Sequence, residues 1–548
     1  MEKKKKMSII VGLITLVLII TLSTTALWKW TSSNNNVGFT ISGLDAYIIY
    51  NKGTDVLAGV LDPVANYTDT SVSTEITLYK NTSKTLYGHI YLDITTIGSN
   101  LANEKALKWV ITSNDKVLNQ GDFVGSKVGD SLSLKLNIPL SQTEQTFKIY
   151  IWLDESMNIN DKIEGETLST IVRAEASEID PSIQTLTKLG VNLNTTVSAD
   201  NIDFNKMPYM TTEQAETNLN YTCSTFYGTA DVSTCLSANF GLSTKEEWIN
   251  KHVSQVDDNG VFAMQDDLGT SYYYRGNVEN NYVNFAGNYW RIIRINGDGT
   301  IRMIYDGPTK KHNGALGADN KVFGSEYNTN YNDNTYVGYM YGATSSDYTN
   351  THSNTNDSTI KANIDKWYED TIIAGGYDKY IADAIYCNDR KVVTGTIVGQ
   401  SYTGDGTRTN VSAYAPLQRI TSASPSLMCN QANDKFSVTS IGNGDLTYPV
   451  ALLTIDEAVM GGINIPDFAT EGVPFSINTY SYLSMADWYW TMSPVAFSVG
   501  AGSWFVRDGF AGDVRVDFSR GVRPVVSLKS DITFTGTGTY DSPFEISG

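Results

Sequence analysis

The N-terminal 28 residues constrain most strongly what the rest of the chain can be. Four lysines, Lys3 to Lys6, precede an uncharged and mostly aliphatic run over residues 7–28. About 20 apolar residues suffice for a helix that spans a bilayer, and flanking lysines remain on the cytoplasmic side. We therefore expect residues 1–28 to direct export and the remainder of the chain to lie outside the cytoplasm.

Two fates of this export segment stay open. Thr24, Thr25 and Ala26 form a small-residue site at which a signal peptide could be cleaved. We favour a retained signal anchor, because residues 544–548 contain neither a basic tail nor a hydrophobic segment that would keep the protein on the cell. The expected localisation is the cell membrane, with a single pass and an extracellular C-terminal part. Cleavage after Ala26 would give a secreted protein instead.

Composition excludes one class of partner and indicates the kind of fold. The formal net charge is −19, and the sequence has no basic stripe of the kind that binds phosphate backbones, so we expect no nucleic-acid partner. The chain has 33 Tyr and 45 Gly but only 13 Pro, a balance typical of β-structure with many turns. Its 548 residues leave room for roughly three domains.

The chain has four cysteines, Cys223, Cys235, Cys387 and Cys429, which allow three disulfide connectivities. We favour Cys223 with Cys235 and Cys387 with Cys429. Disulfides fit an oxidising environment outside the cell; four reduced, buried thiols are the alternative. No Cys-x-x-Cys pair occurs, and none of the four histidines stands at zinc-ligand spacing from a cysteine. We expect neither a metal site nor a cofactor.

In residues 33–178, apolar and polar residues alternate as they do in the strands of a β-protein. In the run from Phe147 to Asp154, apolar Phe147, Ile149 and Ile151 alternate with more polar neighbours. This period of two is typical of a strand with one buried face. Several such strands at near-regular spacing predict an all-β sandwich.

A family resemblance supports this prediction. The lysine-rich export segment, the run from Glu75 to Ser83 and the run from Phe147 to Asp154 resemble the jelly-roll modules of camelysin and biofilm-matrix fibre proteins. The resemblance implies a jelly-roll-like stalk or assembly module rather than an enzyme.

The alternation lapses after residue 178. Residues 179–254 are rich in Thr, Asn and Asp, which predicts a linker with a Cys223–Cys235 loop. A second domain is expected over 255–548, with a polar surface-loop insertion over 309–358. Two β-rich runs around Asn296 to Gly299 predict a hairpin over residues 289–305. Apolar residues at helical spacing predict packed helices over 360–369 and 380–386.

The end of this domain carries its most specific motifs. Tyr489-Trp490-Thr491-Met492-Ser493-Pro494 is followed some thirty residues later by Gly521-Val522-Arg523-Pro524-Val525. This order resembles the bacterial C-type-lectin-like modules, which are related in fold to formylglycine-generating enzymes and include targets of diversity-generating retroelements. The resemblance implies a compact α+β fold, in which Trp490 and Arg523 are scaffold residues and the arginine is paired internally.

Residues 495–520 lie between those motifs and are the candidate ligand-binding segment. They contain no Asn, Lys, Gln, Glu, Met or Thr although the rest of the chain is rich in Asn, Thr and Lys, which is compatible with a hypervariable stretch. The alternative is an ordinary strand and loop pair in which Trp504, Phe505 and Val506 pack inward. In either case we expect an exposed segment whose arginines and aromatics bind a ligand. The candidate contacts are Phe497, Arg507, Asp508, Phe510, Asp513, Arg515, Asp517, Phe518 and Arg520.

The sequence lacks the motifs of common catalytic sites. It has no Gly-rich phosphate loop, no calcium-binding loop and no Gly-x-Ser-x-Gly nucleophile elbow, so we do not expect an enzyme. The predicted function is a bacterial, membrane-tethered adhesin or ligand-binding surface protein that recognises a protein or glycan through residues 495–520. A structural subunit of a cell-surface fibre or biofilm matrix is the alternative.

Overall fold

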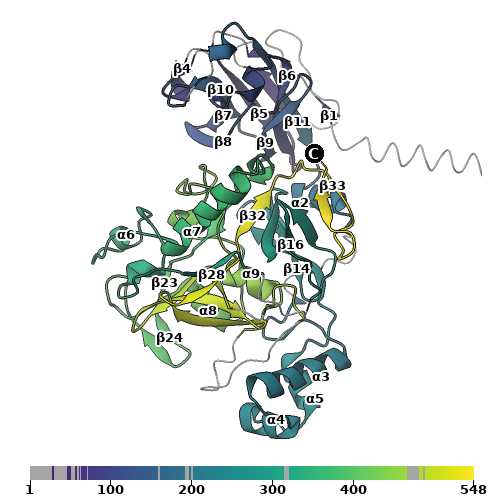
Figure 1. Cartoon of the computed structure of the whole chain (residues 1–548), viewed down its shortest axis with the longest axis vertical. Coiled ribbons are helices and arrows are strands. Elements are labelled where there is room, and N and C mark those ends of the chain that lie inside the picture. The colour runs from purple at the N-terminus through teal and green to yellow at the C-terminus, as the bar shows by residue number, and fades with distance from the viewer. Residues whose placement is uncertain are drawn as a thin grey trace, which may run out of the picture. The chain divides into compact units, whose positions relative to one another are not determined.

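The computed structural model is β-rich and divides into two compact units, Met1–Ile183 and Gln184–Gly548 (Figure 1). The residues that it describes are 28–29, 46–50, 56–57, 61, 63–70, 72–157, 159, 161–191, 197–198, 201–313, 320–465, 480–485 and 488–547. The predicted export segment and its cleavage site lie almost wholly outside these residues. Within them, no helix is both long and apolar enough to cross a membrane.

The N-terminal unit contains two mainly antiparallel sheets. The first has the order β1 (Trp28–Lys29), β11 (Leu168–Ser177), β6 (Tyr87–Ile97), β9 (Ser131–Pro139), with β3 (Val56–Leu57) also on β11. The second has the order β2 (Ala46–Tyr50), β5 (Ser73–Lys80), β10 (Gln145–Asp154), β7 (Leu107–Ser113), β8 (Lys116–Asp122), with β4 (Pro63–Val64) parallel to β10. One hydrophobic core contains residues of both sheets, so the unit is a β-sandwich, as predicted.

Strand β10 shows how the alternating pattern produces this core. Phe147, Ile149 and Ile151 are at most 3% exposed and pack in the core between the sheets. Trp152 belongs to the opposite face by the same alternation, yet it is 7% exposed because the ring of Tyr67 lies 5.8 Å from it. The period of two therefore predicted the inward face correctly, whereas the burial of Trp152 depends on a residue 85 positions away.

The C-terminal unit is built on two larger sheets. The ten-stranded sheet has the order β12 (Val197–Ser198), β13 (Gly260–Asp266), β14 (Gly269–Arg275), β16 (Asn288–Ile295), β15 (Tyr282–Phe285), β34 (Phe544–Ile546), β33 (Phe534–Thr535). Three further strands extend the sheet from β16: β17 (Ile301–Gly307) pairs with β16, β32 (Val525–Leu528) pairs with β17, and β21 (Ile381–Ala382) pairs with β32. The seven-stranded sheet has the order β18 (Phe323–Glu326), β31 (Ser519–Val522), β28 (Tyr489–Phe497), β26 (Ser412–Tyr414), β23 (Val392–Val393), and β29 (Ala501–Arg507) and β30 (Phe510–Arg515) extend it from β28.

Helices and short ribbons complete this unit. Helices α8 (Ala415–Thr421) and α9 (Ile455–Met460) pack against β28, and α7 (Thr359–Tyr368) packs against β18 (Figure 1). The two-stranded ribbons are β19 (Met340–Tyr341) with β20 (Asn356–Asp357), β22 (Tyr386–Cys387) with β27 (Lys435–Phe436), and β24 (Gly395–Ile397) with β25 (Gln400–Tyr402). A short helix, α6 (Tyr348–Thr351), precedes β20.

Two local predictions in this unit are confirmed. Strands β16 and β17 form the predicted hairpin, in which the backbone N–H of Asn296 donates to the carbonyl of Thr300 at 2.9 Å. Helix α7 coincides with the helix expected over 360–369, with Ile360 and Ile364 fully buried. The second expected helix is wrong, because residues 381–382 form β21, which pairs with β32, and residue 386 begins β22, which pairs with β27.

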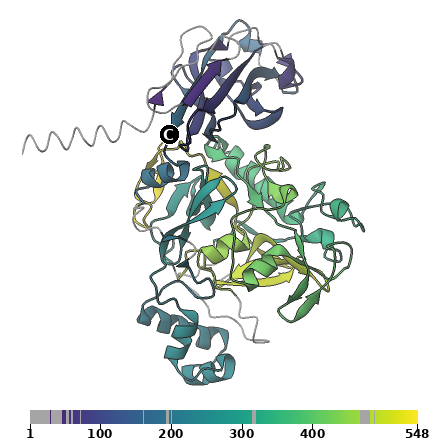
Figure 2. The same cartoon turned by 180° about the vertical axis from the view of Figure 1, so that it is seen from behind.

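The linker predicted over residues 179–254 is also wrong. This region forms α2 (Pro181–Lys188), α3 (Thr212–Tyr221), α4 (Val232–Phe240) and α5 (Lys245–His252), and the last three cluster together in both views (Figures 1 and 2). Their core includes Leu219, Trp248 and the bonded pair Cys223–Cys235. The polar residues read as a linker begin helices: Thr211 caps α3 and Thr244 caps α5, each in a capping box.

The polar segment over 309–358 is a surface loop only in part. Where the structure describes it, many side chains are buried, including Tyr327, Asn334 and Tyr339. Asn334 Nδ2 donates to the backbone carbonyls of residues 408 and 410 at 2.9 and 2.8 Å, and Tyr414 Oη donates to Asn334 Oδ1 at 2.6 Å. The Asn334 amide thus satisfies buried backbone carbonyls, so an Asn-rich and Tyr-rich composition does not by itself indicate exposure.

Candidate functional site

The residues expected to form the scaffold are buried in the C-terminal unit. Trp490 Nε1 donates to the Ser325 carbonyl at 2.9 Å, and Trp504 is fully buried. Arg523 is 1% exposed and donates from Nη2 to Asp306 Oδ1 at 2.8 Å, which is the internal pairing that the sequence resemblance implied. These residues position the strands beside them and are not accessible to a ligand.

The candidate segment 495–520 forms the end of β28, all of β29 and β30, and the start of β31. Three of its nine candidate contacts are not exposed: Phe497, Asp508 and Phe510 are 3%, 6% and 4% exposed. Strand β29 pairs with β28 on one side and with β30 on the other, so the three strands form one packed part of the sheet. The strand-and-loop alternative, with Trp504, Phe505 and Val506 directed inward, describes β29 correctly.

The other six candidates are exposed or partly exposed, and three of them, Arg507, Arg515 and Arg520, contact aromatic residues that the sequence did not single out, Tyr331 and Trp488. Three arginines and three aromatic rings lie in successive contact, and we call this set the arginine–aromatic row. Its members in order of contact are Tyr331, Arg515, Phe518, Arg520, Trp488 and Arg507.

At one end of the row, Arg515 lies between two rings. Its guanidinium carbon is 3.9 Å from the Tyr331 ring centre and 5.4 Å from that of Phe518. Nε and Nη2 donate to the two oxygens of Asp517 at 2.6 and 2.8 Å, and this hydrogen bonding raises the pKa of Arg515. A Cβ atom on Gly500 would come within 2.8 Å of the Arg515 side chain, so glycine there permits the close packing.

At the other end, Trp488 is covered by two arginines. The guanidinium carbons of Arg520 and Arg507 lie 4.2 and 4.7 Å from its rings, while Phe505 stacks on it with ring centres 4.4 Å apart. Arg507 Nε donates to Asp508 at 2.8 Å. Buried residues of the segment therefore position the side chains of the row. Phe505 packs against Trp488, and Asp508 orients Arg507.

A hollow of about 320 Å³ adjoins the row at Arg515. It is lined by residues of the β24–β25 ribbon, of α8, of the end of β28 and the following turn, and of β29 and β30. Its apolar lining consists mainly of Ile397, Val398, Leu417, Val495, Val499 and Val514. Its volume is at the lower end of the range of ligand pockets, which is about 300–1,000 Å³.

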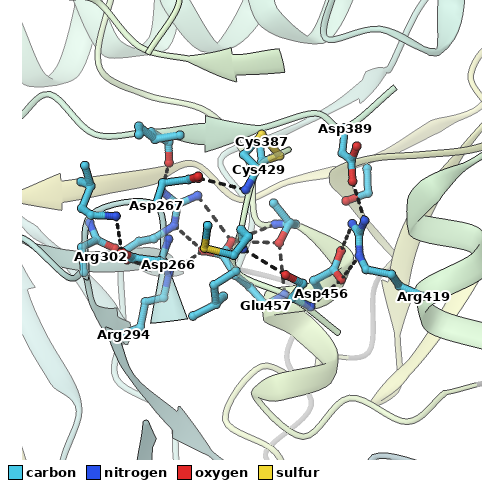
Figure 3. Close-up of a pocket in the computed structure, with 18 residues that line it drawn as sticks. Asp266, Asp267, Arg294, Arg302, Cys387, Asp389, Arg419, Cys429, Asp456 and Glu457 are labelled. Atoms are coloured by element: carbon cyan, nitrogen blue, oxygen red, sulfur yellow. Dashed lines mark hydrogen bonds and ion pairs between the residues drawn. A yellow bond between two sulfur atoms is a disulfide. The ribbon is translucent and has the colours of Figure 1, made fainter. Parts of the chain in front are cut away.

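A second cavity, of about 30 Å³, is surrounded by charged residues (Figure 3). Arg294 contacts Asp266 at 2.7 Å and Glu457 at 2.9 Å, and Arg302 contacts Glu457 at 2.7 Å. Burial would by itself raise the pKa of Glu457, but the two guanidiniums hold it below its usual value.

The same cluster continues towards α8. Arg419 contacts Asp456 at 2.7 Å and Asp389 at 2.5 Å, and burial raises the pKa of Asp389 despite this pairing. The disulfide Cys387–Cys429 lines the cavity, in the connectivity favoured from the sequence. The cavity has room for about one or two water molecules, and among the described residues no group of His, Cys, Asp and Glu fits a metal ion. The cluster ties α8 and α9 to the ten-stranded sheet.

No family model and no curated protein matches the chain. Among solved structures, a family 35 carbohydrate-binding module from an environmental isolate is 14% identical with a TM-score of 0.15, over 24% of this chain and 91% of that one. The PA14 sugar-binding domain from an RTX adhesin is 9% identical with a TM-score of 0.12, over 28% and 86%. Similarity this weak assigns neither fold nor ligand, so the resemblances to camelysin and C-type-lectin-like modules stay predictions.

Proposed function

We propose that this chain is an extracellular, membrane-tethered ligand-binding protein of the adhesin type, which binds through the arginine–aromatic row of its C-terminal unit. The observation that carries the proposal is the row itself, in which the guanidinium carbons of three arginines lie 3.9–5.4 Å from the centres of three aromatic rings. The apolar, lysine-flanked segment at residues 1–28 supports the extracellular location.

The chemistry of the row favours recognition. Trp, Tyr and Arg are the residues that most often dominate binding energies at interfaces. A stacked guanidinium uses its face against the ring and keeps its N–H edge available for carboxylates or carbonyls. Phe518 is 45% exposed and Arg515 is 38% exposed, so the row combines fixed geometry with access from outside.

The buried charged cluster is not a candidate ligand-binding site. Its arginines are paired with carboxylates at 2.5–2.9 Å, and its cavity of about 30 Å³ is too small for an organic ligand. We assign it a structural role. We assign no catalytic role to either region.

Binding by cells that carry the full chain tests this proposal. Such cells are probed with arrays of proteins and of glycans, and the strongest binder is measured against Arg520→Ala and Phe518→Ala. We expect each variant to lose about tenfold in affinity. The matched control is Lys366→Ala, which removes an exposed cation paired with Asp370 on α7 and should bind as the parent does.

Two outcomes would contradict the proposal. Unchanged affinity in both row variants would place the binding site elsewhere. Absence of binding to either class would leave the structural subunit of a fibre or matrix as the remaining function. The mass of the cell-associated protein tests the tether: a mature chain that starts near Leu27 would show that the export segment is cleaved.

A further inference from the structure

The turn of the β24–β25 ribbon carries a strained residue at the edge of the hollow. Ile397 pairs with Gln400, which leaves Val398 and Gly399 as a two-residue turn, and both have positive φ, 49° and 75°. Asn-Gly is the favoured pair for such turns, and a β-branched residue in the left-handed region is an outlier that costs free energy. The turn therefore has a valine where an asparagine would be more stable.

That valine is exposed rather than buried, so packing within the unit does not explain it. Val398 is 44% exposed, and Val499, on the facing turn that follows β28, is 88% exposed. Both line the hollow, as do the more buried Leu417 and Val495. Exposed apolar side chains gathered at one place mark sites of protein association.

The polar residues of the hollow add a charge requirement. Arg515 lies at its edge and donates two of its five N–H groups to Asp517, and its side chain is 38% exposed. A guanidinium held in place by a neighbouring carboxylate and a ring is suited to receive a second carboxylate with little further loss of entropy. The hollow thus offers an apolar pocket whose lining includes one fixed cation, Arg515, and one carboxylate, Asp513.

We propose that the partner is a protein, and that it inserts one bulky aliphatic or aromatic side chain between Val398 and Val499 while a nearby Asp or Glu binds Arg515. This inference rests on the proposed function and specifies its ligand class. A buried apolar anchor beside a charge-assisted hydrogen bond is the usual arrangement of an interface hot spot. The strain at Val398 is retained because an asparagine there would remove apolar surface from the pocket edge.

Selection from a library of short random peptides by the purified full chain tests this inference. We expect the enriched peptides to carry one Leu, Ile, Met, Phe or Trp with Asp or Glu close by. Replacing that apolar residue by Ala, or the acidic residue by its amide, should each weaken binding by about tenfold. Binding should also weaken as salt is raised, because the carboxylate contact is exposed at the edge.

Two substitutions in the chain test the position of the pocket. Ser498 is exposed and lines the hollow, so Ser498→Trp should fill it and abolish peptide binding. Ser346→Trp is the matched control, since Ser346 is exposed and does not line the hollow. Val398→Asn should bind about tenfold more weakly while its Tm is unchanged or higher, a combination that a purely structural role for Val398 would not produce.

The possible failures separate this inference from the proposed function. If the chain binds glycans through the row but selects no peptide of this kind, the partner class is wrong and the ligand-binding function stands. Peptides that bind Ser498→Trp as tightly as the parent would show that the hollow is not the pocket. Binding to neither peptides nor glycans would overturn the inference and the proposed function together.

Discussion

The C-terminal unit contains two arginine-rich regions that use the same side chains in opposite ways. In the buried cluster, Arg294, Arg302 and Arg419 are paired with carboxylates and are largely removed from water. In the arginine–aromatic row, the side chains of Arg515 and Arg507 are 38% and 32% exposed and lie against aromatic rings. Both regions have acidic neighbours, so composition does not distinguish them.

The comparison indicates that the exposure of an arginine to water determines whether it has a structural or a binding role. A buried guanidinium loses its hydration and must recover that free energy from carboxylates, so breaking one pair leaves an uncompensated charge. An exposed guanidinium keeps much of its hydration, and its contacts with rings and carboxylates are individually weak. Removal of one partner from the cluster should therefore destabilise the fold, whereas the row is available for binding.

The largest effect on stability is expected from a substitution that breaks the buried cluster. Glu457 is 3% exposed and contacts both Arg294 and Arg302. Glu457→Gln should lower the free energy of unfolding of the C-terminal unit by about 3–5 kcal/mol, because two buried guanidiniums lose their shared carboxylate. Urea denaturation of the full chain measures this change. A loss below about 1 kcal/mol would show that the cluster is not a stabilising element.

A second prediction concerns His352, a buried group that lacks the compensation seen in the cluster. It is 2% exposed, its Nε2 lies 2.8 Å from the Gly406 carbonyl, and its Nδ1 has no hydrogen-bond partner among the residues that the structure describes. Burial, with the nearby charge of Arg390 adding to it, lowers its pKa to about 3. Because the unfolded chain binds a proton near pH 6.5 and the folded one does not, stability should fall as pH drops.

The expected loss is about 2 kcal/mol between pH 7 and pH 5. Denaturation midpoints measured at a series of pH values for the parent and for His352→Gln give the comparison. The variant should have a flatter profile over this range, whatever its absolute stability. Identical slopes would show that His352 is not the titrating group.

The smallest effect on stability is expected in the row. Arg520 lies 4.2 Å from the Trp488 ring at a partly exposed site. Arg520→Ala should cost about 0.5–1 kcal/mol of unfolding free energy, although it weakens ligand binding about tenfold. The same urea titration applied to this variant and to Glu457→Gln compares the two regions directly. Equal losses in the two variants would contradict the division of roles.

Much of the local structure could be predicted from sequence because it depends on neighbours in the chain. The alternation around Ile149 predicted a strand of a sandwich, and the turn after Ile295 predicted the β16–β17 hairpin. Helices α3 and α5 were missed because their capping residues, Thr211 and Thr244, lie in a polar region with few apolar residues. The capping-box spacing of Thr to Gln or Glu was the signal that could have identified them.

The site was only partly predictable. The exposed Arg515 and Phe518 lay within the predicted segment, but Phe497 and Phe510 are buried because β29 and its neighbours belong to a packed sheet. Trp488 lay close to the recognised motif at Trp490, so its position was a usable signal. Tyr331 is far from the segment in sequence and lies in a stretch expected to be a surface loop.

The sequence by itself determined the alternating strands of the N-terminal sandwich, the β16–β17 hairpin, and that residues 495–520 combine arginine with aromatic side chains. These properties follow from backbone periodicity and side-chain chemistry, which act over a few residues. Only the tertiary structure decided which arginines are buried among carboxylates and which lie on exposed rings. That choice depends on residues such as Tyr331 and Glu457, which approach their arginines only after the sheets and helices have packed and removed some of these groups from water.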